Sequence, residues 1–99
     1  MSTEIILHAA DYPTERDSIE AIIDKNLSGK LDSYIKKLHK WAESIRVELT
    51  LKRENDGKAS GKLIIILNMK SYRSERENFD NLHDLVNHLF WHIKDQLVD

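Results

Sequence analysis

The sequence predicts an α+β fold in the order β-α-β-β-β-α, with a four-stranded sheet and two helices packed on one of its faces. Apolar residues recur at helical spacing in one long segment of the first half and in the closing segment. Apolar residues at strand spacing, or in short continuous runs, mark the remaining segments. A chain of 99 residues can bury one modest core, so residues 1–99 are expected to form a single domain.

The first predicted strand and the first predicted helix follow one another near the start. The run EIILHA at residues 4–9 is short and β-branched, and Pro13 and Thr14 then favour a loop and a helix start. From there to about Trp41 apolar residues recur every three or four positions, which predicts a long amphipathic helix. Gly29 lies inside this helix and leaves room for a bend or a break near LSGK.

Three strands are predicted between the helices. In SIRVELTLKRE apolar and polar residues alternate strictly, which is typical of a strand with one face in water. After a predicted loop, NDGKASG, the nearly continuous apolar run KLIIILNM predicts a central strand. KSYRSEREN is polar and suits an edge strand, because charges discourage pairing with another sheet. A right-handed crossover makes the first two strands parallel if they are neighbours.

The last segment is predicted to be the second helix. Leu82 lies at the centre of the apolar stripe, and at about 100° per residue Trp91 lies roughly 180° around the helix from it. The indole ring is therefore expected to point outward. An outward Trp suits base stacking, a protein partner or a contact between copies of the chain, and cover by a neighbouring helix is the alternative. The predicted stripe consists of Phe79, Leu82, Leu85, Val86, Leu89, Ile93 and Leu97.

Charge is distributed unevenly along a chain whose formal net charge is −2. Residues 1–20 hold one Arg against five Asp or Glu, and residues 79–99 hold one Lys against four Asp. Residues 25–76 hold thirteen Lys or Arg against six acids, an excess of seven that suits a polyanionic partner. Lysines on the outer face of the first helix can follow phosphates, although an ordinary solvated surface is the alternative. These lysines are Lys25, Lys36 and Lys40.

Signatures of enzymes and of cofactor sites are absent from the sequence. It contains no cysteine, no Gly-rich phosphate loop and no serine elbow, so we do not expect catalysis. Asp84, His88 and His92 share one face of the last helix, but two histidines lack the further ligands that a closed zinc site needs, so no metal is expected. With no secretory signal or membrane-spanning segment in view, the chain is expected to be soluble and cytoplasmic.

Three stretches of the chain resemble the ribosome hibernation promoting factors, also described as ribosome-associated inhibitors or sigma-54 modulation proteins. GKLDSYIKKL is similar to the family's Lys-Leu-acid-x-Tyr pattern at the end of the first helix. SIRVELTLKRE is similar to the second strand, and ENFDNLHDLVNHLFWHI to the opening of the second helix. The resemblance spans nearly the whole chain and is to the short members, which lack the C-terminal domain of the long ones.

This resemblance implies a fold similar to double-stranded RNA-binding domains, with basic residues of the helices facing ribosomal RNA. It implies a factor that binds small-subunit rRNA in the channel for messenger and transfer RNA and inhibits translation under stress or in stationary phase. The expected RNA-binding residues are Lys25, Lys30, Lys36, Lys37, Lys40 and Lys94.

The end of the last helix departs from the family pattern. Where the family has a cluster of Lys and Arg, HIKDQLVD holds only Lys94 as a fixed cation beside two acids, which should weaken phosphate binding. The alternative is a divergent member of the fold that acts as a protein-interaction or dimerisation module. Its partner interface would then include Trp91, His88 and His92, with a homodimer formed through the last helix.

Overall fold

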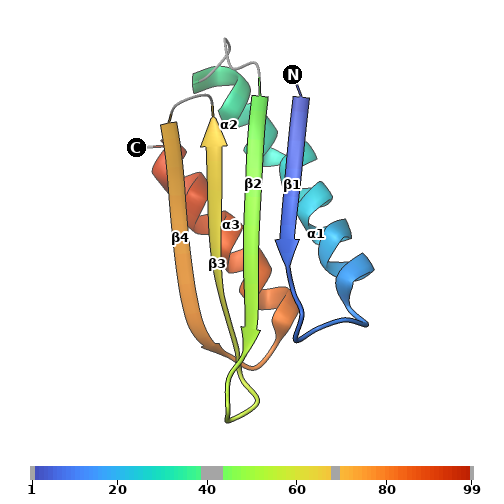
Figure 1. The fold of residues 1–99 in the computed structure, drawn as a ribbon. Coiled ribbons are helices and arrows are strands. Elements are labelled where there is room, and N and C mark those ends of the chain that lie inside the picture. The colour runs from blue at the N-terminus through green and yellow to red at the C-terminus, as the bar shows by residue number, and fades with distance from the viewer. Residues whose placement is uncertain (1, 39–43, 68–69, 99) are drawn as a thin grey trace.

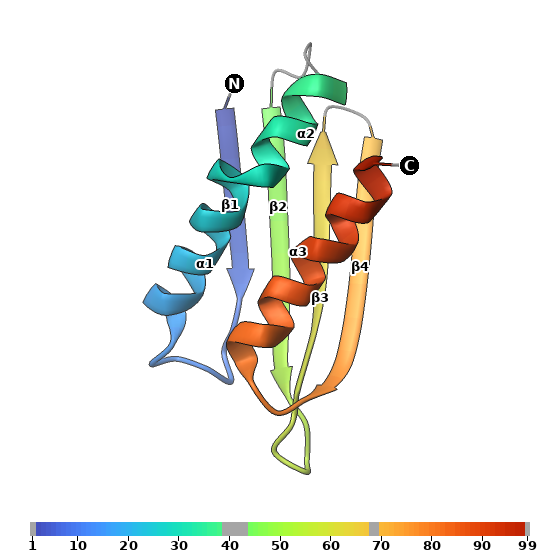
Figure 2. The same cartoon turned by 180° about the vertical axis from the view of Figure 1, so that it is seen from behind.

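A computed structural model describes residues 2–38, 44–67 and 70–98. In this part of the chain a four-stranded sheet carries three helices, all on the same face (Figures 1 and 2). The predicted α+β class is confirmed, with the first helical segment divided in two. No helix in the described ranges is both long enough and apolar enough to span a membrane. The elements are β1 Ser2–His8, α1 Arg16–Ser28, α2 Lys30–Leu38, β2 Ser44–Arg53, β3 Ala59–Leu67, β4 Lys70–Phe79 and α3 Leu82–Val98.

The sheet has the strand order β1-β2-β3-β4. β1 runs parallel to β2, with Ile5 opposite Val47, as predicted for adjacent first and second strands. The β2–β3 and β3–β4 pairs are antiparallel, so the most apolar strand, β3, is central. β4 is an edge strand and carries the charged residues that were expected there.

β3 begins at Ala59, inside the stretch that was predicted to be a loop, so the loop is shorter than expected. Ala59 is paired with Arg53 of β2 and is buried, which extends the ladder toward the turn. The Glu54 amide donates to the Lys58 carbonyl at 2.8 Å, and Gly57 has a φ of 84°. Because a positive φ favours glycine, Gly57 allows the tight turn that lets both strands continue.

The long first helix is broken at Gly29, where the sequence left room for a break. Gly29 has φ −95° and ψ −133°, which is not helical, and α2 restarts at Lys30 in a different direction from α1 (Figure 2). A Cβ at Gly29 would lie 3.0 Å from the Lys25 carbonyl oxygen, a tight contact. The predicted lysine face is therefore divided between two helices and is not one straight row.

A single apolar core lies between the helices and the sheet. Every second residue of β2 points toward it, so the strict alternation seen in the sequence corresponds to one buried face and one exposed face. On the uncovered face of β3, Ile64 and Ile66 are only half-buried. The fully buried side chains include Ile19, Ile23, Ile35, Val47, Leu49, Leu63, Ile65, Leu85, Val86, Leu89 and Ile93.

The last helix begins at Leu82, so the prediction that Phe79 belongs to it was wrong. Phe79 is the final residue of β4, and it packs partly buried against the same core, which explains why it matched the helical stripe. Asn81 starts the helix, because its Oδ1 accepts a hydrogen bond from the Asp84 amide at 3.1 Å. Phe90 is also buried, so the apolar stripe of α3 is wider than predicted.

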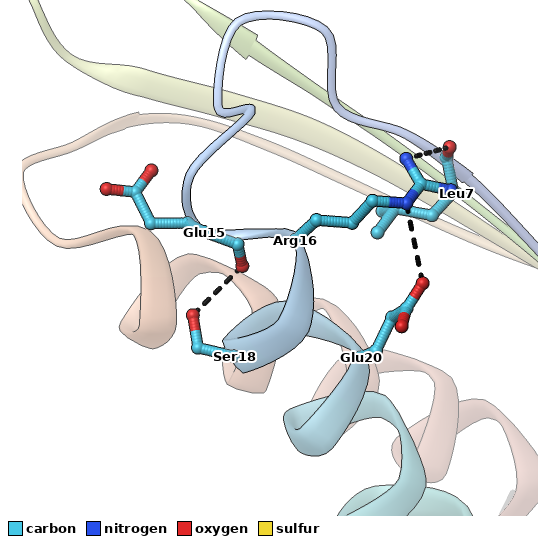
Figure 3. Close-up of polar contacts among 5 residues, drawn as sticks. All are labelled: Leu7, Glu15, Arg16, Ser18 and Glu20. Atoms are coloured by element: carbon cyan, nitrogen blue, oxygen red, sulfur yellow. Dashed lines mark hydrogen bonds and ion pairs between the residues drawn. The ribbon is translucent and has the colours of Figure 1, made fainter.

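The start of α1 is attached to the end of β1 through Arg16 (Figure 3). The Arg16 Nη1 atom donates to the Leu7 carbonyl at 3.4 Å, while its Nε lies 3.5 Å from Glu20 Oε1, one turn further along α1. The Ser18 hydroxyl donates to the Glu15 carbonyl at 2.9 Å, beside the Ile19 amide, which donates to the same oxygen at 2.9 Å. These contacts fix where α1 leaves the sheet.

The loop between β1 and α1 is also held against the end of β2. The buried Tyr12 donates its hydroxyl proton to the Lys52 carbonyl at 3.4 Å, and its ring lies 4.9 Å below the Arg53 guanidinium. Asp11 Oδ2 accepts a hydrogen bond from the Arg53 amide at 2.9 Å. The position of α1 therefore depends on both β1 and β2.

Two neighbouring isoleucines of β3 provide a matched test of this one-sided core. Ile65 is fully buried under the helices, so Ile65→Ala should lower the free energy of unfolding by about 2–5 kcal/mol through lost burial and a residual cavity. Ile64→Ala, on the uncovered face, should cost about 1 kcal/mol. Urea unfolding followed by circular dichroism measures both, and equal losses would contradict a core confined to one face.

Candidate nucleic-acid interface

A groove of about 400 Å³ lies between the C-terminal half of α1 and the outer face of α3. Three of the predicted site residues, Lys25, Lys94 and Trp91, meet in it although they come from opposite ends of the chain. None of the described residues that line it is acidic. The lining consists of Lys25, Asn26, Gly29, Leu31, Asn87, Phe90, Trp91 and Lys94.

The groove has an apolar floor and a polar bridge. Leu31 and Phe90 are buried and continue into the core beneath. Asn26 Nδ2 donates to Asn87 Oδ1 at 3.2 Å, which links α1 to α3, and also to the Ile22 carbonyl at 2.9 Å within its own helix. The two walls are therefore held together by a direct hydrogen bond between helices.

Trp91 forms the outer wall of the groove and is 56% exposed, so the prediction that its ring points outward is confirmed. Lys94 Nζ lies 5.6 Å from the ring centroid. An exposed cation–π contact of this kind contributes about 0.5–1 kcal/mol, so it orients Lys94 only weakly. The Lys94 ammonium is therefore available to a stronger anionic partner.

The two histidines predicted near Trp91 lie in different places. The His88 ring is 5.8 Å from the Trp91 ring and 5.1 Å from the Phe79 ring, so the three rings form a continuous aromatic strip. His92 Nε2 instead contacts Arg76 Nη2 of β4, outside the groove. Among the described residues, no group of three or more His, Asp or Glu side chains is placed to hold a metal ion.

Lys36 of α2 is not among the described residues that line the groove. Lys36 Nζ is 3.0 Å from Asp32 Oδ2, one turn earlier in α2, and this exposed pair is worth about 0.3–0.5 kcal/mol. Part of the Lys36 charge is thus already compensated. Lys30 and Lys37 belong to α2, whereas Lys40 lies outside the described residues.

The asparagines of the groove were missed by sequence reasoning. Asn26 and Asn87 are 61 positions apart and belong to no motif, so only the packing of α1 on α3 brings them together. The one signal in the sequence is the spacing of four residues between Asn87 and Trp91, which puts both on one face of a helix. This spacing does not indicate that Asn87 contacts Asn26 of another helix.

A second concave region lies on the uncovered face of the sheet, with a volume of about 780 Å³. Although it is larger, its charges do not favour an anion: Lys52 and Lys62 stand against Glu54, Glu75 and Glu77, and the Arg76 guanidinium contacts His92 of α3. The Ser60 hydroxyl donates to Glu54 Oε1 at 2.6 Å, so the polar groups there also satisfy each other. A polyanion would gain less on this face than in the groove, where the lining is cationic.

Comparison with known proteins gives a match in structure and none in sequence. No family profile matches the chain, and no curated protein matches its sequence. Among solved structures, it is similar to a ribosomal subunit interface protein from Coxiella burnetii, with a TM-score of 0.57 and 16% identity. The match covers 99% of this chain and 94% of the other. The two proteins share a fold. At this identity the likeness establishes the arrangement of strands and helices and not a common activity.

The hydrogen bond between Asn26 and Asn87 should be measurable by a double-mutant cycle. We expect Asn26→Ala, Asn87→Ala and the double variant to give a coupling of about 0.5–1 kcal/mol in the free energy of unfolding, the usual value of a partly exposed hydrogen bond. The same cycle between Asn26 and Gln96, which donates to the Arg73 carbonyl on the far side of α3, serves as the control. Additive losses for Asn26 and Asn87 would mean that this bond does not hold the groove walls together.

Proposed function

We propose that this protein is a ribosome-associated factor of the hibernation type, which binds small-subunit rRNA in the channel for messenger and transfer RNA and inhibits translation. The observation that carries the proposal is the groove, because it places lysines from two separate helices beside an exposed indole with no acid in its described lining. The fold shared with a ribosomal subunit interface protein supports it.

The chemistry of the groove suits a phosphate backbone. Lys25 projects from α1 and Lys94 from α3, so a strand lying across the two helices meets one ammonium on each side. Such contacts gain chiefly from the release of counterions, and each steepens the fall of affinity with salt by about 0.7–0.9 in a double-logarithmic plot. Lys30, Lys36 and Lys37 belong to α2, the next helix along the chain, and are further phosphate contacts in this proposal.

The proposed inhibition is steric and needs no catalytic group. A rigid domain seated in the channel excludes messenger and transfer RNA for as long as it is bound. With few cations on α3, the affinity should be moderate, which suits a factor that is released when growth resumes. The proposal places the protein in the cytoplasm and its activity under stress or in stationary phase.

A second candidate function follows from the aromatic strip formed by Phe79, His88 and Trp91. An exposed Trp beside other rings is a common centre of protein interfaces, so the chain would then be a protein-interaction or dimerisation module that pairs through α3. Sedimentation velocity separates the two candidates. A dimer that Trp91→Ala converts to a monomer favours the second candidate, and a monomeric wild type favours the first.

Charge reversal in the groove tests the proposed function directly. We expect Lys25→Glu and Lys94→Glu each to weaken co-sedimentation with ribosomes at least tenfold at low salt, because each replaces a phosphate contact with a repulsion. The wild-type association should itself fall steeply between two salt concentrations in a sucrose gradient.

Lys52→Glu is the matched control for these variants. It makes the same charge change at an exposed residue on the uncovered face of the sheet, so it should leave the sedimentation nearly unchanged. A loss of equal size in all three variants would point to net charge and away from the groove. Failure of the wild type to sediment with ribosomes at low salt would refute the proposed function.

A further inference from the structure

We infer that the groove between α1 and α3 binds a single unpaired nucleotide, with its base against Trp91 and its flanking phosphates on Lys25 and Lys94. This inference rests on the proposed function and names the part of the RNA that the groove takes. It predicts that the protein prefers single-stranded segments, such as loops and bulges, to continuous duplex.

The shape and lining of the groove suit a flat aromatic group. Phe90 provides a buried apolar floor, and Trp91 provides an exposed ring at the wall. A volume of about 400 Å³ admits one base and its sugar, whereas paired bases are stacked inside a helix and cannot enter. Unpaired bases, by contrast, are commonly recognised by stacking on aromatic side chains.

The asparagine bridge offers polar groups to the edge of a base. Its hydrogen bond uses one donor of Asn26 and one acceptor of Asn87. Each amide also has a second polar atom, so Asn26 Oδ1 can accept from a base and Asn87 Nδ2 can donate to one. Bases carry donors and acceptors side by side on their edges, and this pair of amides complements such an edge.

The two lysines lie where the backbone of that nucleotide would run. Lys25 and Lys94 come from opposite walls, so they can reach the phosphates on either side of one inserted base. Lys94 now lies over the Trp91 ring, and a base that stacks on this ring displaces the ammonium toward the backbone. The Lys94 ammonium then exchanges its weak, exposed cation–π contact with Trp91 for a charge-assisted hydrogen bond to a phosphate.

The charge of the groove favours RNA over a protein segment as its occupant. Two cations and no acid are found among the described lining residues, whereas three acids line the concave region on the uncovered sheet face. A peptide partner would need an acidic residue on either side of an apolar anchor to match the groove. Every unpaired nucleotide in RNA supplies that arrangement, because a phosphate precedes and follows each base.

Tryptophan fluorescence tests the inference in the full chain. A short polyuridine strand should quench the Trp91 emission as it binds, and an RNA duplex of the same length should quench little. The same titration of Trp91→Leu measures the background from Trp41, the second tryptophan of the chain. Trp91→Leu should also weaken single-strand affinity about tenfold, whereas Trp91→Phe, which keeps a stacking ring, should weaken it much less.

The controls separate failure of this inference from failure of the proposed function. Lys52→Ala, on the uncovered face of the sheet, should leave single-strand affinity unchanged, whereas Lys25→Ala should lower it. Equal affinity for the single strand and the duplex, or binding without quenching, would overturn the inference. If Trp91→Leu instead abolishes self-association and leaves RNA affinity intact, the groove is a protein interface and the inference is again overturned. Should ribosome sedimentation persist in either case, the proposed function stands by itself.

Discussion

Gly61 has no side chain at the point where α3 lies over the sheet, and the side chains of Leu51 and Leu89 meet there. This contact sets how closely α3 approaches the sheet. A Cβ at Gly61 would stand 2.9 Å from Leu51 Cδ2 and 3.1 Å from Leu89 Cδ1, distances at which a neighbour must move. The distance between α3 and the sheet determines where the outer face of α3 lies relative to α1. The groove and the Asn26–Asn87 bond, which both join α3 to α1, depend on that distance.

Patterns within single elements were predictable because they reflect which face of each element is buried. The alternation in β2, the apolar run in β3 and the outward ring of Trp91 follow directly from strand and helix periods. Two errors occurred at boundaries. Phe79 matches the helical stripe but ends β4, and Ala59 lies in a polar, glycine-containing stretch but pairs with Arg53. At both places pairing between strands overrides the local signal.

The site was predictable only in part, because it is formed by side chains from different helices that meet only in the folded chain. Lysines and an outward Trp could be found one helix at a time, but the sequence did not indicate which of them meet. Gly29 ends α1 and separates Lys25 from Lys36, which pairs with Asp32. Packing then brings Lys25 to Lys94 across the groove. Lys25 and Lys36, which were predicted to share one helical face, thus lie on two helices. Lys25 and Lys94, which are far apart in the sequence, line the same groove.

The parallel pairing of β1 with β2 has a consequence for the order in which the protein folds. Successive antiparallel pairs join β2, β3 and β4. Ile5 of β1, by contrast, pairs with Val47 of β2 across the long intervening segment that contains α1 and α2. Contacts between distant segments form late, because closing a long loop costs entropy. We therefore expect the N-terminal half, which carries one wall of the groove, to dock after the C-terminal half, which carries the other. A nucleic acid that bridges Lys25 and Lys94 holds the two halves together, so the bound chain should resist proteolysis better than the free one.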